Sequence, residues 1–397
     1  MPIAIYALSI GAFAICTTEF VIVGLLLEIS RDLHVSTSSA GLLITGYALG
    51  VVLGAPLLMP FLGRLQRKTA LIALAILFVL GNIACAVAPN YESLMAARLV
   101  TAFVQANFFG VGSIIAMKLA PPGREASAIA TMFLGVTLAN VVGAPAGTAF
   151  GQIYGWRLTF VAVAAVGVLA GLSTAFFVPR LKEEAPQNLR REIGVLFQGN
   201  VLRAMLITVL GFGGIFTVFT YVAPLLTEVS RLPAAAVPGV IVLFGIGMLI
   251  GNPIGGRLAD RSLSFAVKAS LLSLVVALLI LEFALRLPYA TVAAIFVFGI
   301  AGFTTLTPLQ MHVLEEAKQA PNLASAVNIG AFNLGNAVGA WLGGVTIDSS
   351  LGLTSVPLVG ALMTLCGLVI AVIPRSLHLQ APLAQPETKV ETDHGRD

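Results

Sequence analysis

Twelve apolar segments, each long enough to form a membrane-spanning helix, take up most of this 397-residue chain. A helix rises about 1.5 Å per residue, so about 20 apolar residues cross the hydrocarbon core of a bilayer. Nearly every gap between the segments holds Gly, Pro or a short charged cluster, which are typical of helix ends. The segments are expected at about 3–27, 39–62, 70–88, 92–119, 126–149, 158–179, 202–227, 235–256, 265–285, 289–311, 324–346 and 354–374. The sequence therefore predicts an all-α membrane protein.

The composition excludes several other classes of protein. Charged residues are 10% of the chain and hydrophobic residues 58%, whereas a soluble domain has roughly 25% charged residues. No polar stretch is long enough for a soluble catalytic domain. The net charge of +4 comes from Lys and Arg in the loops and not from one basic face, so we expect no nucleic-acid partner. The three Cys and four His show no metal-site spacing, and we expect no metal or cofactor.

The basic residues indicate how the chain is oriented, because cytoplasmic loops retain Lys and Arg. If both termini are cytoplasmic, that side holds 17 of the 22 basic residues. The opposite side holds only Arg31, Arg157, Arg231 and Arg286, and Arg98 lies inside the fourth segment. We expect this orientation, and the short loops favour a bacterial inner membrane.

Two matched stretches indicate an internal repeat. Gly54, Pro56 and Arg64 in "GAPLLMPFLGR" each precede their counterparts in "GNPIGGRLADR" by 197 residues. "LANVVGAPAG" and "LGNAVGAWLG" match in the same way at an offset of 196. We therefore predict two parallel six-helix bundles, an architecture of alternating-access carriers. The expected boundaries are a first bundle at 1–179, a linker at 180–200, a second bundle at 201–375 and a polar cytoplasmic tail at 376–397.

Five short motifs resemble one family of transporters. They are "TTEF" in the first span, "LMAARLVTAF" in the fourth, "GAPAG" in the fifth, "YGWRLTF" entering the sixth and "GGRLADR" after the eighth. Together with the twelve spans, they are similar to the major facilitator superfamily, and to its twelve-span drug:proton antiporters such as chloramphenicol-resistance and arabinose-efflux-type permeases. The resemblance implies a transporter of small molecules rather than an enzyme, and we expect a monomer.

The chain departs from the family in the loop after the second span. The family usually carries an Asp followed by Arg and then Gly there, whereas this chain reads "LGRLQRK", with Gly63 in place of the Asp. The acidic residue is present only in the second half, as Asp260 beside Arg261. We expect Asp260 and Arg261 to form a cytoplasmic gate, with a solvated turn as the alternative.

Glu19 is the carboxylate that most needs an explanation. A charged group inside a membrane helix costs several kcal/mol unless it is neutral, paired or solvated, so it marks a functional site by default. Glu19 lies roughly 12 Å below the outer end of its span and Arg98 roughly 8 Å below that of its own span, at similar depth. The resemblance also assigns proton transfer to an arginine at the position of Arg98. We expect a proton-coupling pair, with a static ion pair as the alternative.

Further site residues are predicted as two groups. The resemblance associates Gly143, Pro145 and Gly147 with sealing the outer end of the cavity, although ordinary helix packing would use the same residues. A substrate cavity should be apolar and aromatic with few polar anchors. The candidate lining residues, each of which can instead make a packing hydrogen bond, are Thr18, Tyr47, Gln105, Asn107, Phe108, Phe216, Tyr221, Gln310, Asn328 and Asn333.

These patterns favour a proton-coupled exporter of small, mostly apolar or cationic organic molecules. Efflux or exchange of a sugar or nucleoside is the alternative, with the amide side chains as anchors for hydroxyl groups. A membrane-embedded enzyme would need clustered His, Cys or Asp inside the bundle, and the four His lie at span ends or in loops. A channel is less consistent with a twofold repeat, which favours rocking of the two halves.

Overall fold

The protein is described by a computed structural model, which covers residues 1–35, 37–181, 189–233 and 236–373. These residues form helices and no strands. Ten helices or joined helices are long and apolar enough to cross a membrane. Two more, α3 (Thr37–Leu62) and α16 (Pro321–Asp348), lie at the two remaining predicted spans. The all-α membrane fold is thereby confirmed.

The helices fall into two groups along the chain. The first group is α1 (Ile3–Gly24), α2 (Leu26–Asp32), α3, α4 (Arg67–Ala86), α5 (Tyr91–Leu119), α6 (Glu125–Leu138), the π-helix η1 (Ala139–Gly143), α7 (Ala144–Tyr154) and α8 (Trp156–Phe177). The second group is α9 (Leu189–Leu196), α10 (Gly199–Phe219), α11 (Val222–Pro224), the π-helix η2 (Leu225–Val229), α12 (Val237–Arg261), α13 (Leu263–Ala284), α14 (Pro288–Thr304), α15 (Leu306–Glu316), α16, the 3₁₀ turn η4 (Leu353–Ser355) and α17 (Val356–Val372). Residues 182–188 of the linker predicted at 180–200 and all of the tail predicted at 376–397 lie outside the described residues, and the rest of the predicted linker contains α9 and the start of α10.

Four of the predicted continuous spans are interrupted: the first at Leu25, without a nearby proline, and the fifth, seventh and tenth, each next to a proline. The seventh span breaks at Thr220 and Tyr221, just before Pro224. The fifth span changes from α6 to the π-helix η1 just before Pro145, at the second position of α7. The tenth span breaks at Thr305, between α14 and α15, three residues before Pro308. Proline has no backbone N–H, so the carbonyl one turn before it cannot receive its usual hydrogen bond.

The internal repeat is visible in how two glycines pack. A Cβ on Gly54 of α3 would stand 2.6 Å from the Cα atom of Phe103 on α5. A Cβ on Gly251 of α12 would likewise stand 3.1 Å from the Cα atom of Ile300 on α14. Both pairs are separated by 197 residues from their counterparts, so the same close helix contact is built once in each half.

A polar bond secures each of these contacts. Asn107 Nδ2 donates to the backbone oxygen of Gly54 at 2.8 Å, and Thr304 Oγ1 donates to that of Gly251 at 3.2 Å. Asn107 and Thr304 are again 197 residues apart. The repeat therefore preserves the bond while changing the side chain that makes it.

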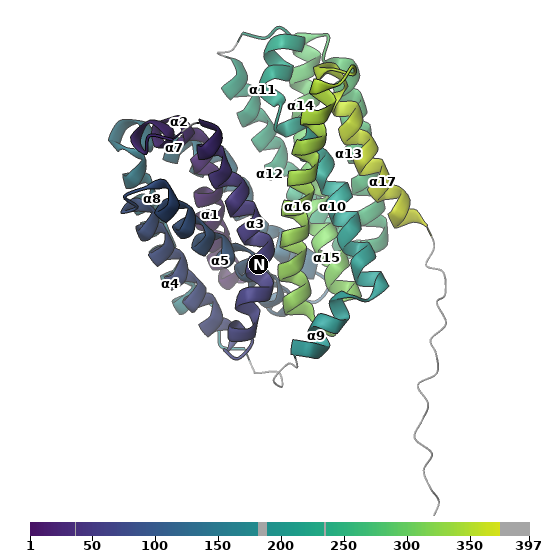
Figure 1. Cartoon of the computed structure of the whole chain (residues 1–397). Helices are drawn as coiled ribbons and strands as arrows, with labels where there is room; N and C mark the ends of the chain where they lie inside the picture. Colours follow the sequence, from purple (N-terminus) through teal and green to yellow (C-terminus); the bar gives the residue numbers. More distant parts are fainter. Residues whose placement is uncertain (36, 182–188, 234–235, 374–397) are drawn as a thin grey trace, which may run out of the picture.

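The two halves meet through a limited set of helices. Figure 1 shows the purple-to-blue and teal-to-yellow halves diverging at the end where α2 and α11 lie. The closest packing between the halves joins α12 to α6 and joins α16 to α3 and α5. A cavity between the halves is thus bounded at one end by packed helices.

Candidate substrate and proton site

An aromatic cavity lies between the two halves. Its walls include nine phenylalanines, of which the second half supplies six: Phe212, Phe216, Phe219, Phe244, Phe303 and Phe332. These rings contact one another, as in the stacked pair Phe219 and Phe244 with centroids 4.7 Å apart. The enclosed volume is about 90 Å³, below the range of drug-sized sites, so a larger ligand requires side chains or helices to move.

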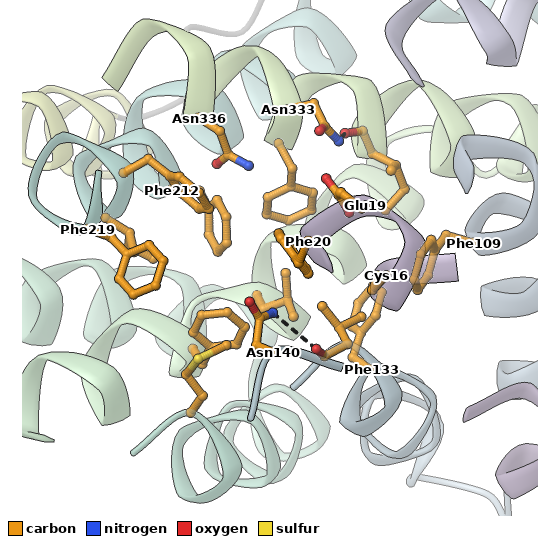
Figure 2. Close-up of a pocket in the computed structure, with 18 of the residues that line it drawn as sticks. Cys16, Glu19, Phe20, Phe109, Phe133, Asn140, Phe212, Phe219, Asn333 and Asn336 are labelled. Atoms are coloured by element: carbon orange, nitrogen blue, oxygen red, sulfur yellow. Dashed lines mark hydrogen bonds between the residues drawn. The ribbon is translucent and has the colours of Figure 1, made fainter. Parts of the chain in front are cut away.

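Glu19 is the one charged residue among those that line this cavity (Figure 2). It extends from α1, and its Oε2 atom accepts a hydrogen bond from Gln105 Nε2 of α5 at 2.9 Å. Cys16, one turn earlier on α1, also lines the cavity. A carboxylate is therefore held by a neutral amide at an apolar surface, where a change in its protonation changes the charge of the whole cavity.

Arg98 bonds the backbone of the helix that carries Glu19 and not the Glu19 carboxylate. Its side chain is completely buried, Nη1 donates to the backbone oxygen of Thr18 at 2.7 Å, and the guanidinium lies 4.4 Å from the ring centroid of Tyr47. Among the described residues no ion pair joins Arg98 to Glu19, and Arg98 Nε and Nη2 are buried without a hydrogen-bond partner. The guanidinium thus keeps two unused donors next to the helix that carries Glu19.

Three asparagines add polar groups to the cavity wall: Asn140, Asn333 and Asn336. Asn140 Nδ2 donates to the backbone oxygen of Val136 at 3.1 Å, the bond drawn in Figure 2. Asn333 Nδ2 donates in the same way to Ile329 at 2.9 Å. These two amides each donate to their own helix, and Asn336 Oδ1 is buried without a hydrogen-bond partner among the described residues, so carbonyl oxygens remain for other partners.

Of the ten residues predicted to line a substrate site, three line the cavity: Gln105, Phe216 and Asn333. The other seven make packing contacts elsewhere in this conformation, as the sequence left open. Thr18 donates to Asn82, Tyr47 lies under Arg98, Asn107 bonds Gly54, Phe108 packs on Gly11, Tyr221 donates to the backbone of Ala340, and Gln310 accepts from Asn328.

Asp260 joins the two halves at the end of the molecule opposite α2. Its carboxylate accepts hydrogen bonds from the backbone N–H of Ala126 at 2.8 Å and of Ser127 at 3.2 Å, and from the Ser127 hydroxyl. These residues begin α6, where the unpaired N–H groups and the helix dipole favour an anion. Arg261, the other predicted gate residue, is exposed.

Asn252 makes a second bond between the halves, and sequence reasoning missed it. Asn252 Nδ2 donates to the backbone oxygen of Ala130 on α6 at 2.9 Å, and its Oδ1 accepts from Thr307 Oγ1 at 3.1 Å. The residue stands between Gly251 and Pro253 in the repeated motif. The sequence signal that could have identified Asn252 is an amide side chain within an apolar span.

The repeat lacks these bonds on the other side of the gate. Asp260 and Asn252 correspond to Gly63 and Ala55 at an offset of 197, and Ser127 corresponds to Leu323 at an offset of 196. The acid, the amide and the hydroxyl are all replaced by groups that cannot make the same bonds. The polar latch of Asp260, Ser127 and Asn252 therefore joins α12 to α6 through side chains that have no counterparts of the same chemistry at the equivalent positions of the sequence.

The predicted outer seal packs within the first half. A Cβ on Gly143 would meet the Thr17 side chain, and one on Gly147 would lie 2.7 Å from Val21, both on α1. The equivalent glycines of α16 pack on α10 in the same way. Pro145 is exposed beside this contact. In this conformation the motif brings α7 against α1.

Comparison with known proteins agrees with this architecture. A family model described as Major Facilitator Superfamily matches residues 8–328. The chain is 44% identical over 382 residues to the inner membrane transport protein YdhP of Escherichia coli (strain K12), covering 96% of each chain. It is 32% identical to a probable sugar efflux transporter of Helicobacter pylori, covering 92% of this chain and 93% of that one. It is 31% identical to a chloramphenicol resistance protein of Streptomyces lividans, covering 89% and 91%.

The fold also matches a solved transporter structure. The crystal structure of the transporter FucP in the outward conformation aligns with a TM-score of 0.74 and 16% sequence identity, over 94% of this chain and 98% of that chain. At this level of identity the match concerns the fold alone.

Proposed function

Because the chain belongs to the major facilitator superfamily, and is thus a transporter of the inner membrane rather than an enzyme, we propose that it is a proton-coupled exporter. Its substrates are small, mostly apolar or cationic organic molecules, moved by alternating access. The observation that carries this proposal is the position of Glu19, a carboxylate on an otherwise uncharged aromatic cavity between the two halves. Aromatic faces and one anion suit lipophilic or cationic solutes.

Glu19 is the proton carrier in this proposal. Protonated Glu19 is neutral and costs little to keep in the apolar cavity, whereas a bound cation favours its ionised form. Substrate and proton therefore compete for one carboxylate. Arg98 offers the unused Nε and Nη2 donors to ionised Glu19 in a second conformation, in which the carboxylate leaves Gln105.

The gate assignments follow from the proposed orientation, with both termini in the cytoplasm. The latch of Asp260, Ser127 and Asn252 then closes the cytoplasmic side, and the diverging ends near α2 and α11 face outward (Figure 1). In the opposite state the outer ends of η1 and α7, which Gly143 and Gly147 already pack on α1, approach the second half and close the outer side. The transport unit is one chain, built of bundles 1–179 and 201–375.

A sugar or nucleoside exporter is the second candidate. The three cavity asparagines, Asn140, Asn333 and Asn336, present amide groups that suit hydroxyl ligands. The resemblance to a probable sugar efflux transporter also favours it. The absence of a second charged residue among the lining groups is compatible with a neutral sugar.

Transport in proteoliposomes tests both candidates. A pH gradient is imposed across vesicles that contain the purified protein, and uptake is followed for lipophilic cations, phenicols, sugars and nucleosides. Uphill movement of a cation or phenicol that ends when the gradient is collapsed supports the proposal. Uphill movement of sugars alone would replace it with the second candidate, and movement only down the substrate gradient would exclude proton coupling.

A further inference from the structure

A second and larger cavity lies within the second half, away from the site between the halves. It encloses about 590 Å³, inside the range of small-molecule sites. Residues near the starts of α10 and α13 and near the ends of α15 and α17 line it. All four are ends of membrane-spanning helices, so the cavity lies where the chain leaves the bilayer.

Two cations line this cavity. Arg203 of α10 is fixed in place because its Nη2 atom donates to the backbone oxygens of Ile370 and Ile373 at the end of α17. Lys268 of α13 is exposed and has no hydrogen bond or ion pair among the described residues. A fixed guanidinium and an unpaired ammonium are a suitable pair of partners for a phosphate group.

Two carboxylates on α15 line the same cavity. Glu315 is half exposed and pairs with Lys318 at 2.5 Å, and Glu316 lies 4.0 Å from His312. Their charge opposes a purely anionic ligand and favours one that also carries a cation. Between the charged groups the wall is apolar, with Ile207 and Val267.

We propose that this cavity binds the headgroup of a phospholipid that carries both a phosphate and a primary ammonium group. Arg203 and Lys268 hold the phosphate, and Glu315 and Glu316 accept the N–H groups of the ammonium. The acyl chains leave along the apolar wall at the bilayer surface. The location at four helix ends favours a lipid over a soluble zwitterion. The inference does not depend on the proposed transport function.

Native mass spectrometry of the full-length protein tests this inference. Delipidated protein in detergent is exposed to equal amounts of phosphatidylethanolamine and phosphatidylcholine with the same acyl chains. These lipids share the phosphate, but only the first has ammonium N–H groups to donate. We expect the wild type to retain about fivefold more phosphatidylethanolamine. Equal retention of the two lipids would overturn the proposal.

Three variants separate the roles of the charges. Lys268→Gln should lower the retention of both lipids, and the double variant Glu315→Gln with Glu316→Gln should abolish the preference between them. Lys68→Gln, the same charge change at the start of α4 in the other half, should have no effect. An equal loss in Lys68→Gln would contradict the site, as would retention of soluble O-phosphoethanolamine as strong as that of the lipid. Unchanged thermal unfolding of each variant shows that the fold is retained.

Discussion

Glu19 and Phe216 occupy equivalent positions in the two halves, 197 residues apart, and both face the cavity between them. One half therefore contributes a carboxylate where the other contributes an aromatic ring. The partner of Glu19 follows the same division, because Gln105 corresponds to Gly302, which has no side chain to donate. The repeat preserves the scaffold, and the two halves differ in the chemistry that they bring to the cavity.

The helix contact at Gly54 yields a prediction about stability. In Gly54→Ala the new methyl group would lie 2.6 Å from the Phe103 Cα atom, and backbone cannot move aside as a flexible side chain can. Overpacking of this kind costs about 1–3 kcal/mol. We expect a lower thermal unfolding midpoint in detergent. Gly239→Ala is the matched control, since no atom lies within 4 Å of the added group; a similar decrease in both variants would refute the contact.

The latch predicts a change in conformational equilibrium without a change in affinity. Asp260→Asn removes the charge that accepts the N–H groups of Ala126 and Ser127, so the closed state of the proposed cytoplasmic side should become less populated. Distances between spin labels across the cytoplasmic ends report that population, and substrate binding should remain nearly intact. Arg261→Gln alters the adjacent charge and should have a smaller effect. A selective loss of affinity in Asp260→Asn would contradict a gate role.

A latch like that of Asp260 and Ser127 can be introduced at the equivalent positions of the repeat. The double variant Gly63→Asp with Leu323→Ser places an acid and a hydroxyl at the positions that match Asp260 and Ser127. We expect the cytoplasmic side to stay closed for longer and turnover to fall, because two latches must then open together. Gly63→Asp alone should act more weakly. Transport rates and spin-label distances measure both effects, and faster turnover in the double variant would count against the latch.

A cluster at the junction of α2 and α8 links pH to stability. Asp32 receives hydrogen bonds from Arg157 and from Trp156 Nε1, the latter at 3.1 Å, and the Arg157 bond holds the pKa of this carboxyl below its ordinary value of about 3.9. The stabilisation is therefore complete above about pH 4 and is lost as the pH falls through the lowered pKa. The difference in unfolding midpoint between wild type and Asp32→Asn should shrink below pH 4. A difference that is constant with pH would exclude this ion pair as its source.

The fold was largely predictable because the hydropathy of the spans and the charge of the loops between them can be read directly from the sequence. All twelve predicted spans coincide with helices to within a few residues. The break before Pro308 follows from the missing N–H group of proline, but the sequence alone does not tell at which residue the helix is interrupted. The repeat offset also identified equivalent glycines, such as Gly54 and Gly251, whose contacts the structure shows to be alike.

The site was less predictable because it depends on which helix faces meet. Glu19 stood out by its charge, but its contact with Gln105 rather than Arg98 depends on rotamers and helix rotation. Asn252 lay inside a motif that was used only for its repeat, so its bond to the other half was missed. Apolar residues such as Phe244 carry no signal that separates a cavity wall from a lipid-facing surface.

Proton release from the purified protein tests the central claim most directly. The protein is placed in weakly buffered detergent solution, and the pH is followed while lipophilic cations and phenicols are added to wild type and to Glu19→Gln. Glutamine preserves the shape of the side chain and removes its titratable group. We predict release of protons by the wild type and none by Glu19→Gln, with substrate still bound by the variant. Equal release by both proteins would contradict the account, because coupling would then belong to another group.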